Sequence, residues 1–180
     1  MGSALRARKR APGGFERHAY SGSEQVANYQ VRYVMDKQDG KMAGKIALIT
    51  GAAGGIARGV ARAFAEEGAA VVITDIFQEG LDETKAGIEN DYRVEVLDLL
   101  VDGANEEKVA DAISQTIDRF GRLDVIVDCA DAEISGIPLV EHTHEHFERA
   151  ITTGLYATFY YMKHGYPYLK ETEGSVINFG

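Results

Sequence analysis

Short apolar runs alternate with longer amphipathic segments along the chain from residue 45 onward. Each run is rich in Val, Ile and Leu, which is the pattern of a strand buried on both faces of a parallel sheet. Between the runs, apolar residues recur at helical spacing. The strands are expected at 46–50, 70–74, 94–97, 123–127 and 175–178, and the helices at 56–67, 80–89, 105–120 and 143–164. This alternation requires right-handed crossovers, so we expect an α/β fold with a Rossmann-type doubly wound parallel sheet, truncated after the fifth strand.

The composition agrees with a single folded domain. Of the 180 residues, 45% are hydrophobic and 26% are charged, as in soluble globular proteins. No apolar run approaches the roughly 18 residues needed to cross a bilayer, which excludes a membrane-spanning protein. The net charge of −9 argues against a general nucleic-acid-binding protein. Cys129 is the only cysteine, which excludes an internal disulfide and a cysteine-based zinc cluster, and we expect a cytoplasmic protein.

The residues before the first expected strand carry the opposite charge. Residues 1–20 hold five basic side chains against Glu16 alone. Residues 21–44 add a short amphipathic stretch and a polar linker. We therefore assign 1–44 to a basic, flexible extension and 45–180 to the nucleotide-binding domain. A targeting peptide, or sequence upstream of a later start codon, are the alternatives for the extension.

A glycine-rich turn, Thr50-Gly-Ala-Ala-Gly-Gly-Ile-Ala57, joins the first expected strand to the first expected helix. Gly51 permits a tight turn, and Gly55 lets the backbone approach a pyrophosphate at the helix N-terminus. Asp75 stands 24 residues after Gly51, at the end of the second expected strand. A carboxylate there can accept both ribose hydroxyls and would repel a 2′-phosphate. The sequence therefore predicts dinucleotide binding, with NAD preferred to NADP.

With these features the chain resembles the short-chain dehydrogenase/reductase family over residues 45–180. The motifs that carry the resemblance are Thr50-Gly51-x-x-x-Gly55-Ile56, Asp75, Leu97-Asp98-Leu99 and Gly174-Ser-Val-Ile-Asn178. The resemblance implies an NAD-dependent oxidoreductase that interconverts small-molecule alcohols and carbonyls by hydride transfer. It also implies that Asp98 contacts the adenine ring and that Ile56 packs near the pyrophosphate. The expected cofactor-binding residues are Gly51, Ala53, Gly55, Ile56, Asp75, Asp98, Leu99, Cys129 and Ala130.

The chain departs from the pattern of the family in three segments. Ala57 replaces its third glycine, which crowds the helix against the strand. Where the family has Asn-Asn-Ala-Gly, this chain has Asp128-Cys129-Ala130-Asp131, and Asp131 adds a charge beside the ribose. Gly154 aligns with the catalytic Asn, whose amide orients a water molecule in the family. These changes favour a second hypothesis, a non-catalytic Rossmann subunit or nucleotide-responsive partner of an active dehydrogenase. A vestigial fragment is a third.

No catalytic residue is assigned in this chain. In the family, the catalytic Ser and the Tyr-x-x-x-Lys pair lie beyond the fifth strand, where the Tyr acts as general acid/base. Two Tyr-x-x-x-Lys pairs occur elsewhere, Tyr33 with Lys37 and Tyr166 with Lys170. The first pair precedes the nucleotide fold, and the second falls before the fifth strand in an expected loop, so neither receives a catalytic role.

Two further features concern the region of residues 142–164. His142, His144 and His146 could suggest a metal site, but solvated residues at a helix end are the commoner explanation, and no metal is expected. The helix expected at 143–164 carries a broad apolar stripe that includes Phe147, Leu155 and Phe159. In the family this helix pairs with its copy in a neighbouring subunit, so a homo-oligomer is implied. The alternative is that residues before Lys45 fold back over the stripe.

Overall fold

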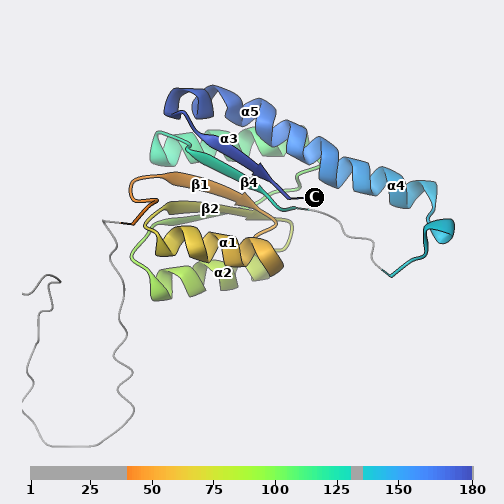
Figure 1. Cartoon of the computed structure of the whole chain (residues 1–180), viewed down its shortest axis with the longest axis horizontal. Helices are drawn as coiled ribbons and strands as arrows, with labels where there is room; N and C mark the ends of the chain where they lie inside the picture. The colour runs from red at the N-terminus through yellow and green to blue at the C-terminus, as the bar shows by residue number, and fades with distance from the viewer. Residues whose placement is uncertain (1–39, 131–135, 180) are drawn as a thin grey trace, which may run out of the picture. The chain divides into compact units, whose positions relative to one another are not determined.

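The computed structural model describes residues 40–130 and 136–179, and these contain a parallel sheet of five strands (Figure 1). The strands lie in the order β3-β2-β1-β4-β5. Their bounds are β1 (Ile46–Thr50), β2 (Ala70–Asp75), β3 (Val96–Leu100), β4 (Val125–Asp128) and β5 (Ser175–Asn178). Because each strand returns to the sheet in the same direction as its neighbours, the expected Rossmann-type doubly wound α/β fold is confirmed.

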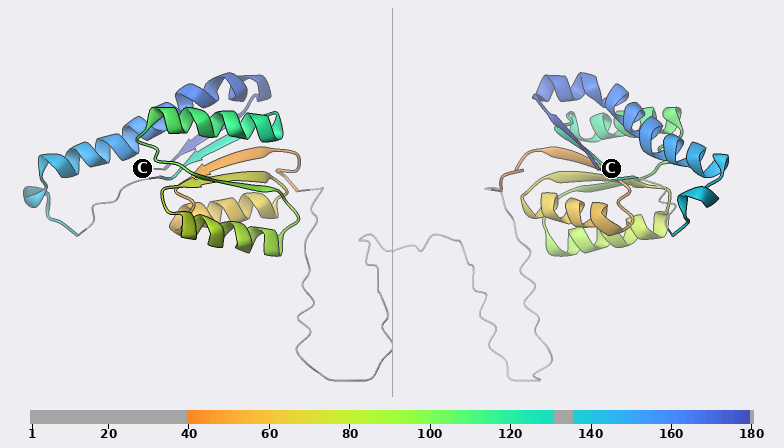
Figure 2. Two further views of the ribbon diagram at one scale, coloured as in Figure 1. Left: turned by 180° about the vertical axis from the view of Figure 1, so that it is seen from behind. Right: turned by 45° about the vertical axis from the view of Figure 1, so that its right-hand side comes forward.

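Two pairs of helices cover the two faces of the sheet, as the two views of Figure 2 show. Helices α1 (Gly55–Glu66) and α2 (Gln78–Asp91) pack on one face, and α3 (Glu106–Phe120) and α5 (Ala157–Thr172) pack on the other. The side chains of β1 alternate between the two cores: Ile49 joins the cluster with α1 and α2, and Leu48 joins the cluster with α3 and α5. None of the described helices is both long and apolar enough to cross a membrane.

Helix α1 packs on the sheet with a face that agrees only in part with its apolar spacing. That spacing predicts an inward stripe of Ile56, Val60, Ala63 and Phe64; Val60 and Phe64 pack against the core, whereas Ile56 and Ala63 are exposed. The fully buried residues of the helix are Ala57, Ala61 and Ala65. Small side chains on this face let the helix lie close to the sheet directly after the glycine-rich turn. The prediction was therefore right for Val60 and Phe64 and wrong for Ile56 and Ala63.

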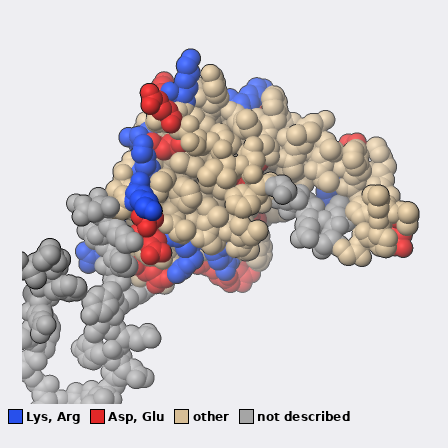
Figure 3. Space-filling model, viewed as in Figure 1, with Lys and Arg blue, Asp and Glu red and all other residues tan. Residues whose placement is uncertain are grey.

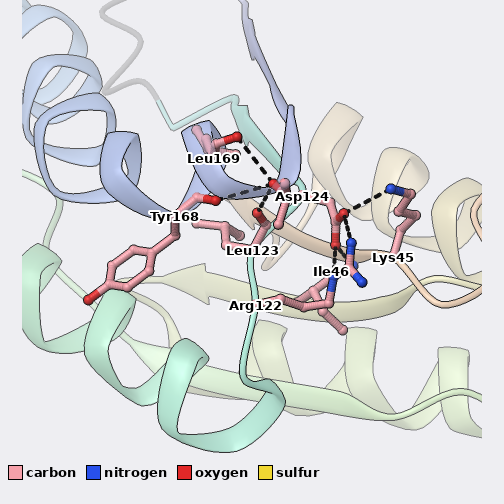
Figure 4. A network of polar contacts seen from close by, with 8 residues as sticks. Lys45, Ile46, Arg122, Leu123, Asp124, Tyr168 and Leu169 are labelled. Carbon is pink, nitrogen blue, oxygen red and sulfur yellow. Dashed lines mark hydrogen bonds and ion pairs between the residues drawn. The ribbon is translucent and has the colours of Figure 1, made fainter.

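The strand boundaries also differ from the sequence prediction. Strands β3 and β4 begin at Val96 and Val125, two residues later than expected, and β3 continues to Leu100. The start of β4 is set by Asp124, which is only 3% exposed and lies at the amino end of the sheet (Figure 4). Its carboxylate accepts hydrogen bonds from Lys45 Nζ at 3.0 Å and the Ile46 N–H at 2.9 Å. It also accepts from Arg122 Nε at 2.9 Å and Nη2 at 2.6 Å. This network holds the starts of β1 and β4 together.

The helix expected at 143–164 is longer and less regular than predicted. It consists of α4 (His144–Ala150), a π-helical segment η2 (Ile151–Tyr156) and α5, which continues through Pro167 to Thr172. The Thr143 hydroxyl accepts from the His146 N–H at 3.2 Å and caps α4, as expected for the first residue. The prediction of a loop around Tyr166 was wrong, because this residue lies inside α5. Burial of Gly165 and Leu169 against the sheet outweighs the loss of one backbone hydrogen bond at the proline.

Candidate nucleotide-binding site

A cleft of about 420 Å³ lies at the carboxyl edge of the sheet. Each of β1 to β4 contributes a residue at or just beyond its end: Gly51, Asp75, Val101 and Ala130. Arg149 and Thr153, from α4 and η2, complete the lining. The sheet order reverses direction between β1 and β4, which is the place where open α/β sheets bind their ligands.

The glycine-rich turn has the geometry expected of a phosphate-binding loop. Gly51 has a φ of +70°, and a Cβ there would lie 3.0 Å from the Cα of Ala130, so only glycine fits. Gly55 has a φ of +54° and nothing within 4 Å of its Cβ position. Helix α1 begins without a side-chain cap and without an acid in its first turn. Its first N–H groups are therefore available to an anion.

Asp75 connects the glycine-rich turn to the end of β2. Its Oδ2 accepts the Ala53 N–H at 2.9 Å, and its Oδ1 accepts the N–H groups of Ile76 at 2.7 Å and Phe77 at 3.1 Å. These three bonds fix the carboxylate at the cleft. A carboxylate has about four acceptor positions, so one on Oδ2 remains for a ribose hydroxyl. Ala53 itself is held by contact with α2, because a Cβ at Gly80 would lie 2.6 Å from the Cβ of Ala53.

The structure does not bring Asp98 and Leu99 to the cleft. Both lie inside β3, where Asp98 is opposite Ile73 in the neighbouring strand. The Asp98 carboxylate accepts from Lys85 Nζ at 2.6 Å and from Gln78 Nε2 at 3.2 Å. Burial would raise the pKa of Asp98, but the hydrogen bond and charge of Lys85 hold it below the ordinary value.

The residues that reach the cleft from β3 are Val101 and Asp102, which the sequence reasoning missed. Val101 extends the sheet by one bond, because its N–H donates to the Asp75 carbonyl at 2.8 Å. Asp102 follows it and accepts the Ala104 N–H at 3.0 Å. The signal was present in the sequence, since the apolar run continues to Val101. The strand was predicted at 94–97, so Asp98 was wrongly expected at its carboxyl end.

Cys129 and Ala130 lie at the cleft as expected. Their N–H groups donate to the Thr50 hydroxyl at 3.0 and 2.9 Å. Burial, together with the charge of Asp128, raises the pKa of the Cys129 thiol. A raised pKa favours the protonated thiol over the thiolate.

Gly154 lies in η2, next to the cleft-lining Thr153, and presents no side chain there. Tyr166 is 62% exposed on α5 and does not line the cleft. The rings of His142 and His146 meet edge to face at 5.6 Å, and His146 Nδ1 lies 3.3 Å from the Thr143 N–H that it accepts at the start of α4. Asp131, the Tyr33–Lys37 pair and the basic extension up to residue 39 lie outside the described residues.

Comparison with known proteins agrees with this geometry. A family model described as enoyl-(acyl carrier protein) reductase matches residues 51–180. The 12α-hydroxysteroid dehydrogenase of a Clostridium species is 47% identical over 142 residues, which are 76% of this chain and 55% of that protein. The L-fucose dehydrogenase of Oryctolagus cuniculus is 37% identical over 138 residues, 77% of this chain and 47% of that protein.

Solved structures show the same relationship. Carveol dehydrogenase from Mycobacterium avium in complex with NAD superposes with a TM-score of 0.72 at 27% identity, over 77% of this chain and 55% of that one. An NAD⁺-bound xylitol dehydrogenase gives a TM-score of 0.73 at 27% identity, over 77% and 53%. The chain spans about half the length of the curated relatives it matches. The family match over 51–180, the similar sequences and the shared fold together show that the chain belongs to the short-chain dehydrogenase/reductase family.

Proposed function

We propose that this chain is the NAD-binding part of an oxidoreductase that interconverts alcohols and carbonyls by hydride transfer. The observation that carries the proposal is the position of Asp75, whose carboxylate is bonded to the glycine-rich turn and lines the cleft at the carboxyl edge of the sheet. The relatives named above are dehydrogenases of a steroid and of a sugar, and two of the similar structures contain NAD.

The cleft and the start of α1 beside it suit different parts of the cofactor. The uncapped start of α1 would hold the pyrophosphate, with Ile56 exposed beside it. Asp75 would accept a ribose hydroxyl, and Asp102 would face the base from the end of β3. When bound, the nicotinamide supplies the site that accepts or donates the hydride.

The charge at the ribose position supports NAD in preference to NADP. The Asp75 carboxylate would repel a 2′-phosphate. Ile76 follows it and offers an apolar side chain, 70% exposed, where a cation could have paired with that phosphate. A non-catalytic, nucleotide-responsive subunit is the second candidate. It is favoured by Gly154, which gives η2 no side chain at the position of the catalytic Asn of the family.

The broad apolar surface of α4, η2 and α5 supports a homo-oligomer. Phe147, Leu155, Phe159 and Met162 are all at least 42% exposed on it. Figure 3 shows mainly uncharged atoms over the middle of this view, whereas Lys, Arg, Asp and Glu gather along its left edge, which includes the carboxyl end of α5. An exposed apolar surface of this kind is typical of a subunit contact. The cytoplasmic location stays an expectation from the sequence.

A titration of the full chain with NADH and NADPH, followed by nucleotide fluorescence, tests the proposed function. We expect saturable binding of NADH and at least about tenfold weaker binding of NADPH, which corresponds to about 1.4 kcal/mol. Equal affinity for the two would remove the NAD preference. Binding of neither would overturn the proposal.

A further inference from the structure

Arg149 is the only cation among the described residues that line the cleft. Its side chain is exposed, and no described residue forms an ion pair with its guanidinium. One helical turn later, the Thr153 hydroxyl donates to the Arg149 carbonyl at 2.9 Å and joins it in the lining. The two residues line the cleft from α4 and η2, together with residues from the strand ends.

The two acids of the cleft, Asp75 and Asp102, are not the partners of the Arg149 guanidinium. The Asp75 carboxylate is held by three backbone N–H groups, and Asp102 accepts the N–H of Ala104. Both acids are thus positioned by their own turns. The guanidinium remains available to a ligand in a cleft that it shares with them.

The cleft is the base end of the binding site. Gly55 and Ile56, at the start of α1, do not line it, so the place for the pyrophosphate lies beyond its edge. The residues that line the cleft include Asp75, which would bind the ribose, and the apolar residues Ile76 and Val101. Ile76 is 70% exposed, an aliphatic surface without a cover. A planar heterocycle would cover that surface and leave its other face open.

We propose that Arg149 closes the cleft over the adenine ring by stacking its guanidinium on the ring face. An arginine suits this position because its guanidinium is planar, weakly hydrated and attracted to π-systems. The N-terminus of α1 is already available to bind the pyrophosphate, so Arg149 is not needed as a second phosphate ligand. This inference rests on the proposed function only in taking an adenine nucleotide as the ligand.

The test compares the affinity of the full chain for adenosine and for AMP, by calorimetry. Arg149→Met removes the charge and the plane but keeps an unbranched side chain, and Arg149→Lys keeps the charge but not the plane. Arg93→Met is the matched control, because Arg93 is an exposed arginine outside the cleft. Circular dichroism verifies that each variant is folded, which we expect because the Arg149 side chain is exposed.

We expect Arg149→Met to weaken the binding of adenosine and AMP alike, by about three- to thirtyfold. Arg149→Lys should recover only part of this loss, and Arg93→Met should change neither affinity. A loss for AMP but not for adenosine would show that Arg149 binds phosphate and would overturn the inference. Unchanged affinities in Arg149→Met would overturn it as well.

The same titrations separate this inference from the proposed function. If adenosine binding depends on Arg149 while NADH does not bind, the inference stands and the proposed function falls. If NADH binds and Arg149→Met has no effect, the inference alone falls. If neither adenosine nor AMP binds the unmodified chain, the inference is wrong.

Discussion

The Thr50 hydroxyl donates a hydrogen bond of 2.6 Å to the carboxylate of Asp128, which is only 3% exposed. The same hydroxyl accepts the N–H groups of Cys129 and Ala130. Thr158, on α5, donates to the second oxygen of Asp128. One threonine at the end of β1 therefore positions the end of β4 directly beneath the cleft.

Thr50→Val should destabilise the fold by about 2–3 kcal/mol, because one oxygen of the buried Asp128 carboxylate and two backbone N–H groups lose their partner. The midpoint of urea unfolding measures the change. Thr152→Val is the matched control, since among the described residues that hydroxyl bonds to the carbonyl of Glu148, one helical turn earlier. A loss of stability in Thr50→Val no greater than in the control would show that the network does not hold the two strand ends together.

Asp75→Asn should narrow the preference for NADH over NADPH by about tenfold, because it removes the negative charge that faces the 2′ position. Asparagine keeps one acceptor oxygen, which serves either the Ala53 N–H or those of Ile76 and Phe77, so part of the local hydrogen bonding is lost equally for both nucleotides and the ratio of their affinities reports the charge. The ratio of the two dissociation constants, from fluorescence titration, gives the result. Asp82→Asn on α2 removes the same charge away from the cleft and should leave the ratio unchanged. An identical ratio in Asp75→Asn and the unmodified chain would contradict the assignment.

Much of the fold followed from pattern alone, because buried parallel strands and amphipathic helices differ strongly in period. The predicted boundaries of helices and strands were wrong where tertiary packing outweighed a local sequence preference. Pro167 argues against a helix, yet the burial of Leu169 extends α5 through it. Asp98 interrupts an apolar run and so looked like a strand end, whereas Lys85 neutralises it in the middle of β3.

The candidate site was predictable only in part. The glycine-rich turn and Asp75 act through the backbone geometry of one strand-to-helix connection and through the end of the next strand, so their spacing reveals them. Arg149 comes from a helix that meets the strand ends only in three dimensions. No spacing within one segment could indicate that contact.

Glu173→Gly should stabilise the fold by about 0.5–1 kcal/mol. Glu173 ends α5 with a φ of +53°, in the left-handed region that favours glycine. The control is the same substitution two residues earlier, Glu171→Gly, which lies inside the last turn of α5 and should destabilise by about 0.5–1 kcal/mol. Thermal unfolding reports both changes. Equal shifts of the same sign would refute strain at Glu173.

The fold should lose stability on acidification through the ordinary titration range of aspartate. Burial would raise the pKa of Asp124, but hydrogen bonds from Arg122, Ile46 and Lys45 hold it below its usual value. At a pH near the ordinary pKa of aspartate, the unfolded state binds more protons than the folded state. The contribution of Asp124 to the free energy of unfolding is therefore complete above this pH range and is lost as the pH falls through it. Arg122→Met should make the free energy of unfolding less dependent on pH between about 5 and 3. Arg119→Met, which breaks an exposed pair with Glu95, should have little effect. An unchanged pH dependence in Arg122→Met would contradict the role of Asp124.

The last prediction concerns self-association through α4, η2 and α5. Phe159 is 56% exposed on α5, and Lys163 lies 6.0 Å from its ring centre. If two copies pair through this surface, Phe159→Glu should place a charge in the contact and shift a dimer or larger species toward monomer at micromolar concentration. Ala63→Glu, which adds the same charge on exposed α1, should leave association unchanged. Deletion of residues 1–38 tests the alternative that these residues cover the apolar surface. Pairing of the helices predicts unchanged association in the deletion variant, whereas a covering extension predicts stronger association. Sedimentation velocity measures all four proteins, and a clean monomer for the unmodified chain would contradict the subunit contact.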